Sequence, residues 1–127
     1  MPEWVKTHWP KYVEGCERVG RPASTDAWRV ARSVFVADDE ATAREYALGP
    51  DSPYRYYFNS LVTKMKKGGR LELFKTSRDM PDDEVTLEFV LDKLVTFGTP
   101  NKVADELASF RENVGEFGTM LYAGHDW

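Results

Sequence analysis

The sequence has little of several residue types on which common functional sites depend. It contains one cysteine, Cys16, and two histidines, His8 and His125. A single cysteine excludes an intramolecular disulfide and a cysteine-rich zinc site, and two histidines leave little material for a histidine-based metal centre. We therefore expect no metal site. Cys16 lies on the apolar side of an expected helix, which favours a buried packing residue over a reactive thiol.

Long apolar runs and clusters of positive charge are also missing. No stretch approaches the roughly 20 apolar residues of a membrane span, and the first four residues lack the pattern of a signal peptide. The 21 acidic residues outnumber the 17 basic ones, which gives a formal charge of -4. Nucleic-acid binding depends on clustered Lys and Arg. These features predict a soluble, cytoplasmic protein with neither nucleic acid nor a membrane as partner.

The length of 127 residues fits a single domain covering residues 1–127. A complete (β/α)₈ barrel takes about 250 residues, so the chain is too short to form one. No internal repeat, low-complexity segment or linker divides the sequence.

The first half of the chain predicts one strand between helices. Apolar residues spaced by four and three predict a helix over residues 10–19, with Pro10 placing its start near Trp9. Residues 28–37 are rich in β-branched and aromatic residues on both alternating sets, which predicts a strand covered on both faces. Asp38 or Asp39 is then expected to cap a helix over 40–47. A further helix is predicted over 53–67, followed by an irregular segment over 70–83.

The second half predicts two more helices and a second strand. A helix is expected from Asp83 to about residue 97. Thr99 and Pro100 have the types preferred at a helix N-cap and first turn, and they predict a helix that ends at Gly115 in the left-handed conformation. Residues 117–123 predict a second buried strand. The fold class is therefore α/β, mostly helical, with two or three strands.

Several segments, in this order, resemble the C-terminal part of luciferase-like flavin-dependent monooxygenases, closest to the limonene-monooxygenase-like branch. They are Trp28-Arg29-Val30-Ala31-Arg32 with Val34-Phe35-Val36-Ala37-Asp38, Gly98-Thr99-Pro100 with Val103 and Leu107, and Phe117-Gly118-Thr119 with residues 121–127. The resemblance spans nearly the whole chain. No single motif among them is specific, and the Thr-Pro helix start alone is a generic pattern.

The resemblance implies a TIM-barrel enzyme that uses reduced FMN, supplied by a separate flavin reductase, and O₂ to oxygenate a small organic substrate. The chain corresponds only to a C-terminal fragment of that barrel, incomplete at both ends. Family residues that hold the flavin phosphate lie mostly in the absent portion, so none is transferred, and FMN is not expected to bind tightly to this fragment. The substrate, and the choice between FMN and a deazaflavin, stay open.

Active sites of such barrels lie where strands end and the following loops begin. This rule selects Gly124, His125, Asp126 and Trp127 after the second strand, and the aromatic cluster with Tyr54 and Tyr57 after the first. His125 is the candidate catalytic residue, because an imidazole titrates near neutrality. The other five residues are candidates for the substrate or flavin pocket.

Each candidate also has a structural interpretation. His125 and Asp126 could be a polar chain end, because adjacent residues of an extended chain point to opposite sides. The aromatic cluster from Tyr54 to Phe58 could form a lid over a flavin or an apolar substrate, but aromatic residues at helical spacing more often fill a core. Arg32, in the middle of a strand, must point to a water-filled mouth, pair with an acid or lie at an edge, and a structural ion pair is favoured. For Asp38 and Asp39, helix capping is favoured over cation binding.

A second hypothesis for the function is a catalytically silent module. A partial barrel leaves an open strand edge and an uncovered apolar face, which favour self-association into a homo-oligomer or docking of a separate N-terminal half-barrel.

Overall fold

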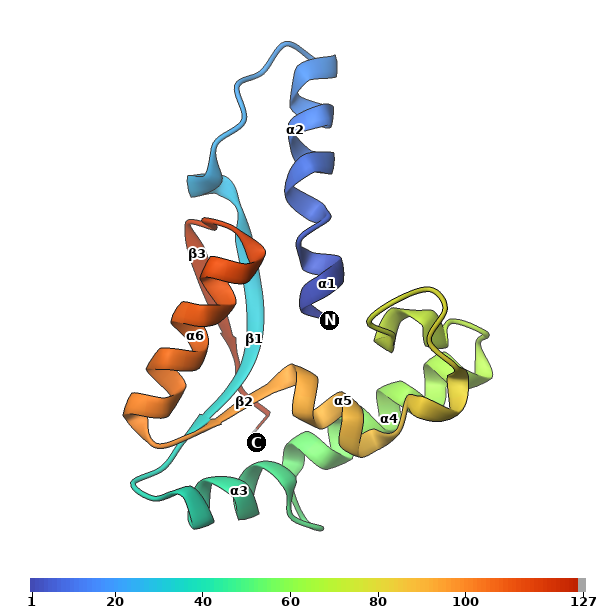
Figure 1. Ribbon diagram of the computed structural model, residues 1–127, viewed down its shortest axis with the longest axis vertical. Coiled ribbons are helices and arrows are strands. Elements are labelled where there is room, and N and C mark those ends of the chain that lie inside the picture. Colours follow the sequence, from blue (N-terminus) through green and yellow to red (C-terminus); the bar gives the residue numbers. More distant parts are fainter. Residues whose placement is uncertain (126–127) are drawn as a thin grey trace.

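The computed structural model describes residues 1–125 of the protein (Figure 1). Its helices are α1 (Pro2–Val5), α2 (His8–Arg18), α3 (Glu40–Leu48), α4 (Pro53–Lys67), α5 (Leu87–Leu94) and α6 (Pro100–Val114). Its strands are β1 (Arg29–Val36), β2 (Val95–Gly98) and β3 (Thr119–Ala123). Short 3₁₀ turns occupy Thr25–Ala27, Leu71–Phe74 and Asp82–Glu84. The α/β class predicted from the sequence is confirmed.

The three strands form one parallel sheet in the order β2-β1-β3. Strand β3 pairs with the first part of β1, from Arg29 opposite Thr119 to Ser33 opposite Ala123. Strand β2 pairs with the second part, from Ser33 opposite Val95 to Val36 opposite Gly98. The strands predicted over 28–37 and 117–123 are thus both confirmed, and the first of them is central.

The prediction of one helix from Asp83 to residue 97 is wrong at both ends. Asp83 lies in a 3₁₀ turn, and α5 begins only after Thr86, whose hydroxyl oxygen accepts a hydrogen bond from the Phe89 amide at 3.1 Å. The chain is already extended at Val95 and continues as β2. Val95, Thr96 and Phe97 are β-branched or aromatic types, which suit a strand, but they follow an apolar helix without a break in the pattern.

The helix ends match the sequence predictions in part. Of the two candidate caps of α3, Asp39 accepts the hydrogen bond, from the Thr42 amide at 2.8 Å. Thr99 occupies the N-cap of α6 without a side-chain capping bond. Its amide instead donates to the Glu40 carboxylate at 3.2 Å, which joins α6 to α3. Gly115 does end α6 with a positive φ, but at 131° it lies outside the left-handed helical region that was predicted.

The apolar core falls into two clusters. The larger one packs α3, α4 and α5 together beyond the end of β1, and its buried members are Ala47, Tyr54, Phe58, Leu71, Phe74, Met80, Val85, Val90, Leu91 and Val95. The smaller one packs α6 on one face of β1, with Val30, Phe110, Val114 and Phe117 buried. Figure 1 shows α3, α4 and α5 together at the lower end of the molecule and α6 alongside β1. Cys16 is buried, as predicted.

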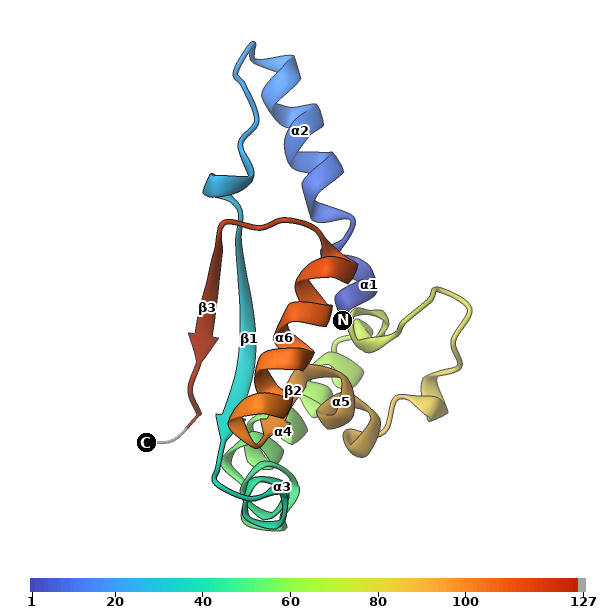
Figure 2. The ribbon, with the colours of Figure 1, turned by 60° about the vertical axis from the view of Figure 1, so that its left-hand side comes forward.

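Strand β3 is not the buried strand that its composition predicted. Leu121 is 48% exposed and Tyr122 is 65% exposed. In Figure 2, β3 lies at one side of the sheet, with β1 between it and the helices. Strand β1 itself has exposed residues at Arg29, Ala31 and Val36, so its two faces are not fully covered.

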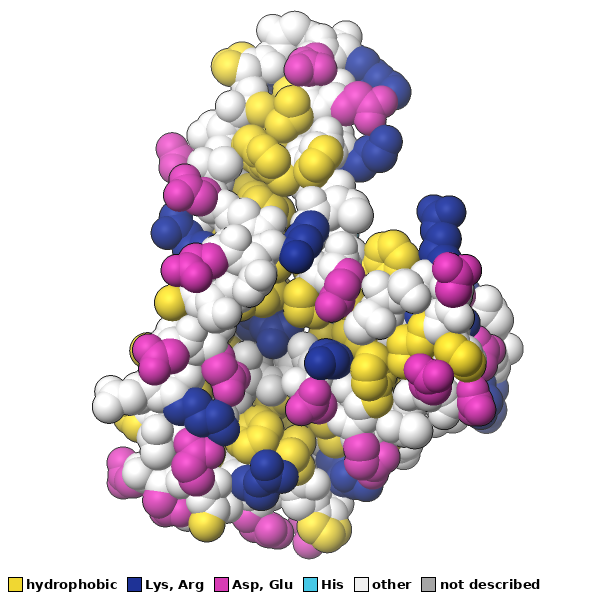
Figure 3. Space-filling model, in the orientation of Figure 1, with side chains coloured by type: hydrophobic (Ala, Val, Ile, Leu, Met, Phe, Trp, Pro, Cys, Tyr) yellow, Lys and Arg dark blue, Asp and Glu magenta, His cyan; other side chains and the backbone are white. Residues whose placement is uncertain are grey.

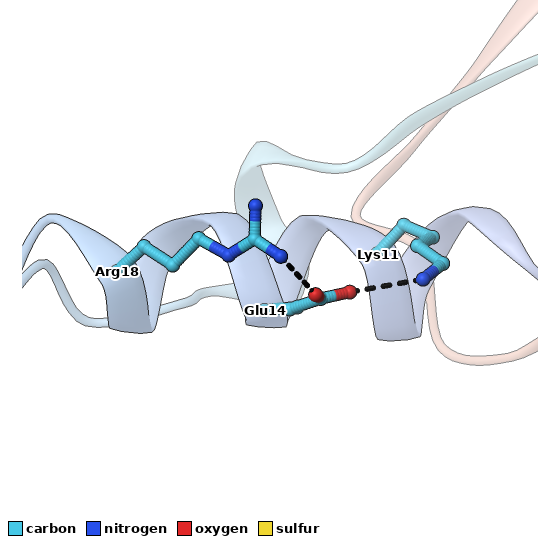
Figure 4. A network of polar contacts seen from close by, with 3 residues as sticks. All are labelled: Lys11, Glu14 and Arg18. Carbon is cyan, nitrogen blue, oxygen red and sulfur yellow. Dashed lines mark hydrogen bonds and ion pairs between the residues drawn. The ribbon is translucent and has the colours of Figure 1, made fainter.

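Helix α2 forms an arm that lies beside the sheet (Figure 1). It begins at His8, close to the predicted start, and Trp9 stacks on Trp28 with ring centroids 5.5 Å apart. Its outer side carries exposed ion pairs from Glu14 to Lys11 and Arg18 (Figure 4), which contribute little to stability because water screens them. Figure 3 shows apolar side chains at the surface of this arm, where Val19 is 68% exposed.

Substitution of alanine at Gly118 and at Gly15 should change the free energy of unfolding in opposite directions. An added Cβ at Gly118 would lie 2.5 Å from the Asp26 Cα, whereas one at Gly15, inside α2, would meet nothing within 4 Å. We expect Gly118→Ala to lower the free energy of unfolding by about 2 kcal/mol or more, because a backbone must move. Gly15→Ala should raise it by about 0.5–1 kcal/mol through helix propensity. Urea unfolding measures both, and equal effects would contradict the close contact at Gly118.

Candidate functional site

His125 lies just beyond β3 and turns back against the centre of the sheet. Its side chain is 7% exposed, and its Nε2 lies 2.8 Å from the Ser33 hydroxyl oxygen. Ser33 is itself buried in β1, where it pairs with Ala123. Parallel pairing of β3 with β1 therefore brings the two ends of this hydrogen bond together across 92 positions of sequence.

Aromatic rings from α4 surround the imidazole. The Tyr57 ring lies 4.3 Å from it at an interplanar angle of 31°, and the rings of Tyr54 and Phe58 contact it more steeply at 5.0 and 5.9 Å. These three residues share one face of α4, because positions three and four apart are neighbours on a helix. The Tyr54 hydroxyl donates to the Val34 carbonyl oxygen at 2.8 Å, which fixes the start of α4 on β1.

Burial lowers the pKa of His125 from its ordinary value of 6.5. The imidazole is therefore neutral at pH 7, and a neutral imidazole has one nitrogen that donates a hydrogen bond and one that accepts. Because Nε2 is engaged by Ser33, the hydroxyl fixes how the ring is oriented beside Tyr57.

A cavity of about 830 Å³ opens beside this cluster, between α4 and the residues that precede it. His125 and Tyr57 form part of its wall, together with Tyr56, Pro53, Arg55 and Lys64. The volume lies within the range of small-molecule sites. Arg55 is paired with Glu88 at 2.7 Å, whereas Lys64 forms no ion pair within residues 1–125. The wall thus combines flat aromatic surface with the carboxylate of Asp51 and with the Lys64 cation, which is unpaired among the described residues.

The structure brings together three of the predicted site residues, His125, Tyr54 and Tyr57. Tyr54 is 2% exposed and supports the site from within the core, so the lid interpretation does not apply to it. Gly124 lies outside the cavity wall, where an added Cβ would come 3.2 Å from the Tyr122 ring. Asp126 and Trp127 lie outside the described residues.

Ser33 is the site residue that sequence reasoning missed. A hydroxyl in the middle of an apolar strand was the available signal, because a buried polar group requires a hydrogen-bond partner. The ion pair predicted for Arg32 is wrong. Its guanidinium donates instead to the Lys93 carbonyl oxygen at 3.2 Å and to Thr96 Oγ1 at 3.1 Å.

Within residues 1–125, no group of three or more His, Cys, Asp or Glu side chains is arranged to hold a metal ion. None of the helices in this part of the chain is long and apolar enough to cross a membrane.

The fold places the chain in a known structural class. Its three parallel strands and their helices match about a third of a luciferase-like TIM-barrel enzyme. That enzyme, from Pseudomonas putida, is a type II Baeyer-Villiger monooxygenase, the oxygenating constituent of 3,6-diketocamphane monooxygenase, in complex with FMN. The TM-score is 0.78 at 24% identity, over 96% of this chain and 33% of that one.

Sequence comparison leads to the same proteins. The chain is 24% identical over 124 residues to 3,6-diketocamphane 1,6-monooxygenase and 22% identical over 126 residues to 2,5-diketocamphane 1,2-monooxygenase 2, both from Pseudomonas putida. These alignments cover 97% and 98% of this chain but 32% and 34% of the relatives. The chain is therefore a distant relative of the diketocamphane monooxygenases that spans about a third of their length. No family model matches it.

The lowered pKa of His125 predicts a pH dependence of stability. The unfolded chain binds a proton near pH 6.5, whereas the folded chain does so only at lower pH. The contribution is therefore complete above that pH and is lost as the pH falls through the folded pKa. Between about pH 7.5 and 5, wild type should lose more free energy of unfolding than His125→Gln, whose amide does not titrate. Urea unfolding across this range measures the difference, and parallel curves for the two proteins would refute it.

Proposed function

We propose that the chain contributes one wall of the site of a flavin-dependent monooxygenase that uses reduced FMN and O₂ to oxygenate a small organic substrate. The observation that supports this most is the match of the fold to the FMN-bound oxygenating constituent, combined with a cavity of about 830 Å³ beside His125, just after the end of β3. Ligands of parallel α/β folds bind at this end of the strands. The relatives' names make a cyclic ketone the first substrate to test.

The described residues fit a flavin in part. Tyr57 offers a flat ring beside which an aromatic ring system can stack, and Lys64 offers a cation for an anionic group. When bound, reduced FMN supplies the electrons for activating O₂. The chain's own contribution is a neutral imidazole at His125, held by Ser33, that exchanges a hydrogen bond with a substrate or flavin oxygen.

The family resemblance supplies further candidates for the pocket and a source of reduced FMN. Gly124, Asp126 and Trp127 stay candidates for the pocket, and a flavin reductase stays the proposed source of reduced FMN. Because the chain spans about a third of the length of these relatives, we propose that the remaining walls of the site lie outside the matched third. FMN is therefore proposed to bind this chain weakly.

Titration of FMN with the purified chain, followed by flavin fluorescence, tests the site. We expect weak, saturable binding that Lys64→Gln weakens several-fold, because a cation beside the cavity is lost. Lys66→Gln is the matched control, since it removes the same charge from the same helix but away from the cavity wall. Equal effects of the two substitutions, or no saturable binding, would contradict the proposed flavin wall. Turnover of a cyclic ketone with a reductase present would then show that the chain alone is active.

The second candidate function is the catalytically silent module, alone as a homo-oligomer or docked to a half-barrel. It is favoured by strand β3, which has one neighbour within residues 1–125 and presents Leu121 and Tyr122 to solvent. Such an edge is a template for pairing with another chain.

Sedimentation velocity over a range of concentrations tests self-association. We expect reversible oligomers that Leu121→Asp disperses, because a charge on β3 opposes the burial of that strand. Val19→Asp is the control, since Val19 is also exposed and apolar but lies at the far end of α2. A stable wild-type monomer would eliminate self-association and leave docking to a half-barrel as the form of the silent-module hypothesis still to be tested.

A further inference from the structure

Arg32 lies next to Ser33 in β1 and points to the opposite face of the strand, because successive side chains of a strand alternate. Its guanidinium lies over the Phe110 ring, with Cζ 4.6 Å from the centroid. Nη1 donates to the Lys93 carbonyl oxygen and Nη2 to Thr96 Oγ1, at 3.2 and 3.1 Å. These three contacts fix the guanidinium between β2 and α6, on the side of the sheet away from His125.

Among residues 1–125, the Arg32 guanidinium has no counter-ion. Within residues 1–125 no carboxylate lies within ion-pair distance of Arg32, and its Nε is buried without an acceptor. Burial lowers the pKa of Arg32, and the more distant Glu106 carboxylate opposes that shift only as the smaller effect. A buried charge is costly unless a group of opposite charge pairs with it. No side chain of the described part of the chain supplies that opposite charge within ion-pair distance of Arg32.

A cavity of about 460 Å³ lies against the same guanidinium. Besides Arg32, its charged lining residues are the cations Lys6 and Lys93 and the carboxylates Glu3 and Glu106. The hydroxyl of Ser109 also lines it. The cations among these side chains outnumber the carboxylates, although Lys93 also pairs with Asp92 at 3.5 Å. Besides the N–H groups that bind Lys93 and Thr96, Nη1 and Nη2 each carry a second N–H that can donate to an oxygen atom of an anion.

We propose that this cavity binds a small oxyanion, a carboxylate or a phosphate, through the Arg32 guanidinium. The site is separate from the cavity beside His125, since the two lie on opposite faces of β1. It therefore does not depend on the monooxygenase proposal. Lys6 adds long-range attraction, whereas Glu3 and Glu106 are carboxylates that the bound anion must approach.

Inorganic phosphate and acetate, each titrated into the full chain at constant ionic strength with chloride as the balancing ion, test the proposal. We expect saturable binding by calorimetry and a rise in the melting temperature that chloride does not reproduce. Preference for one anion assigns the site to phosphate or to carboxylate ligands. Absence of saturable binding of both anions would overturn the proposal.

Substitutions then locate the binding. Arg32→Met should weaken binding at least about tenfold, since it removes the charge-assisted hydrogen bonds while keeping an apolar side chain over Phe110. Arg29→Met is the matched control, because Arg29 is exposed in the same strand. His125→Gln should leave the affinity unchanged. Equal weakening by Arg32→Met and Arg29→Met would overturn the assignment.

Glu106→Gln provides a test that does not require the Arg32 variant to fold. If an external anion pairs with Arg32, removal of the nearby carboxylate should tighten binding several-fold. If Glu106 is itself the partner of Arg32 in solution, the substitution should lower the melting temperature and leave anion binding no tighter. That second result would overturn the proposal.

Discussion

Strand β1 is the element on which the rest of the structure depends. Both β2 and β3 pair with it, and within residues 1–125 they do not pair with each other. Every inter-strand hydrogen bond of this sheet therefore involves β1. The Tyr54 hydroxyl also binds the β1 backbone, at Val34, so the larger helical cluster is attached to the same strand. Because successive side chains of β1 point to opposite faces, Ser33 meets His125 on one face and Arg32 meets α6 on the other.

The sequence was sufficient for the parts of the fold that local chemistry determines. The β-branched run of β1, the cap at Asp39 and the proline at the start of α6 each have a local cause, and the structure confirms them. Strand β2 was missed because Val95 to Phe97 continue the apolar pattern of α5, so that only pairing with β1 makes them a strand. The exposure of β3 depends on which neighbours it has, and composition does not specify neighbours.

The candidate site also has features that the sequence indicates and features that only the fold determines. His125 and the aromatic cluster could be selected because they follow strands, but their contact with Ser33 could not, since 92 positions separate the two side chains. The expectation of an ion pair at Arg32 failed for a related reason. A mid-strand arginine requires hydrogen-bond acceptors, and a carbonyl oxygen and a hydroxyl from other elements met part of that need. Residue types thus indicated which groups needed partners, whereas the identity of each partner came from the fold.

The pairing of β3 with β1 has a consequence for the order in which the molecule forms during synthesis. Thr119 pairs with Arg29, and His125 contacts Ser33. Strand β1 therefore acquires its β3 neighbour only after nearly the entire chain has been synthesised. Contacts between such distant positions form slowly, and an unpaired strand edge is open to other chains during that time. The helices α3, α4 and α5 lie close together in sequence and can pack first. The imidazole side of the candidate site is therefore completed last, after the helices that hold its aromatic rings.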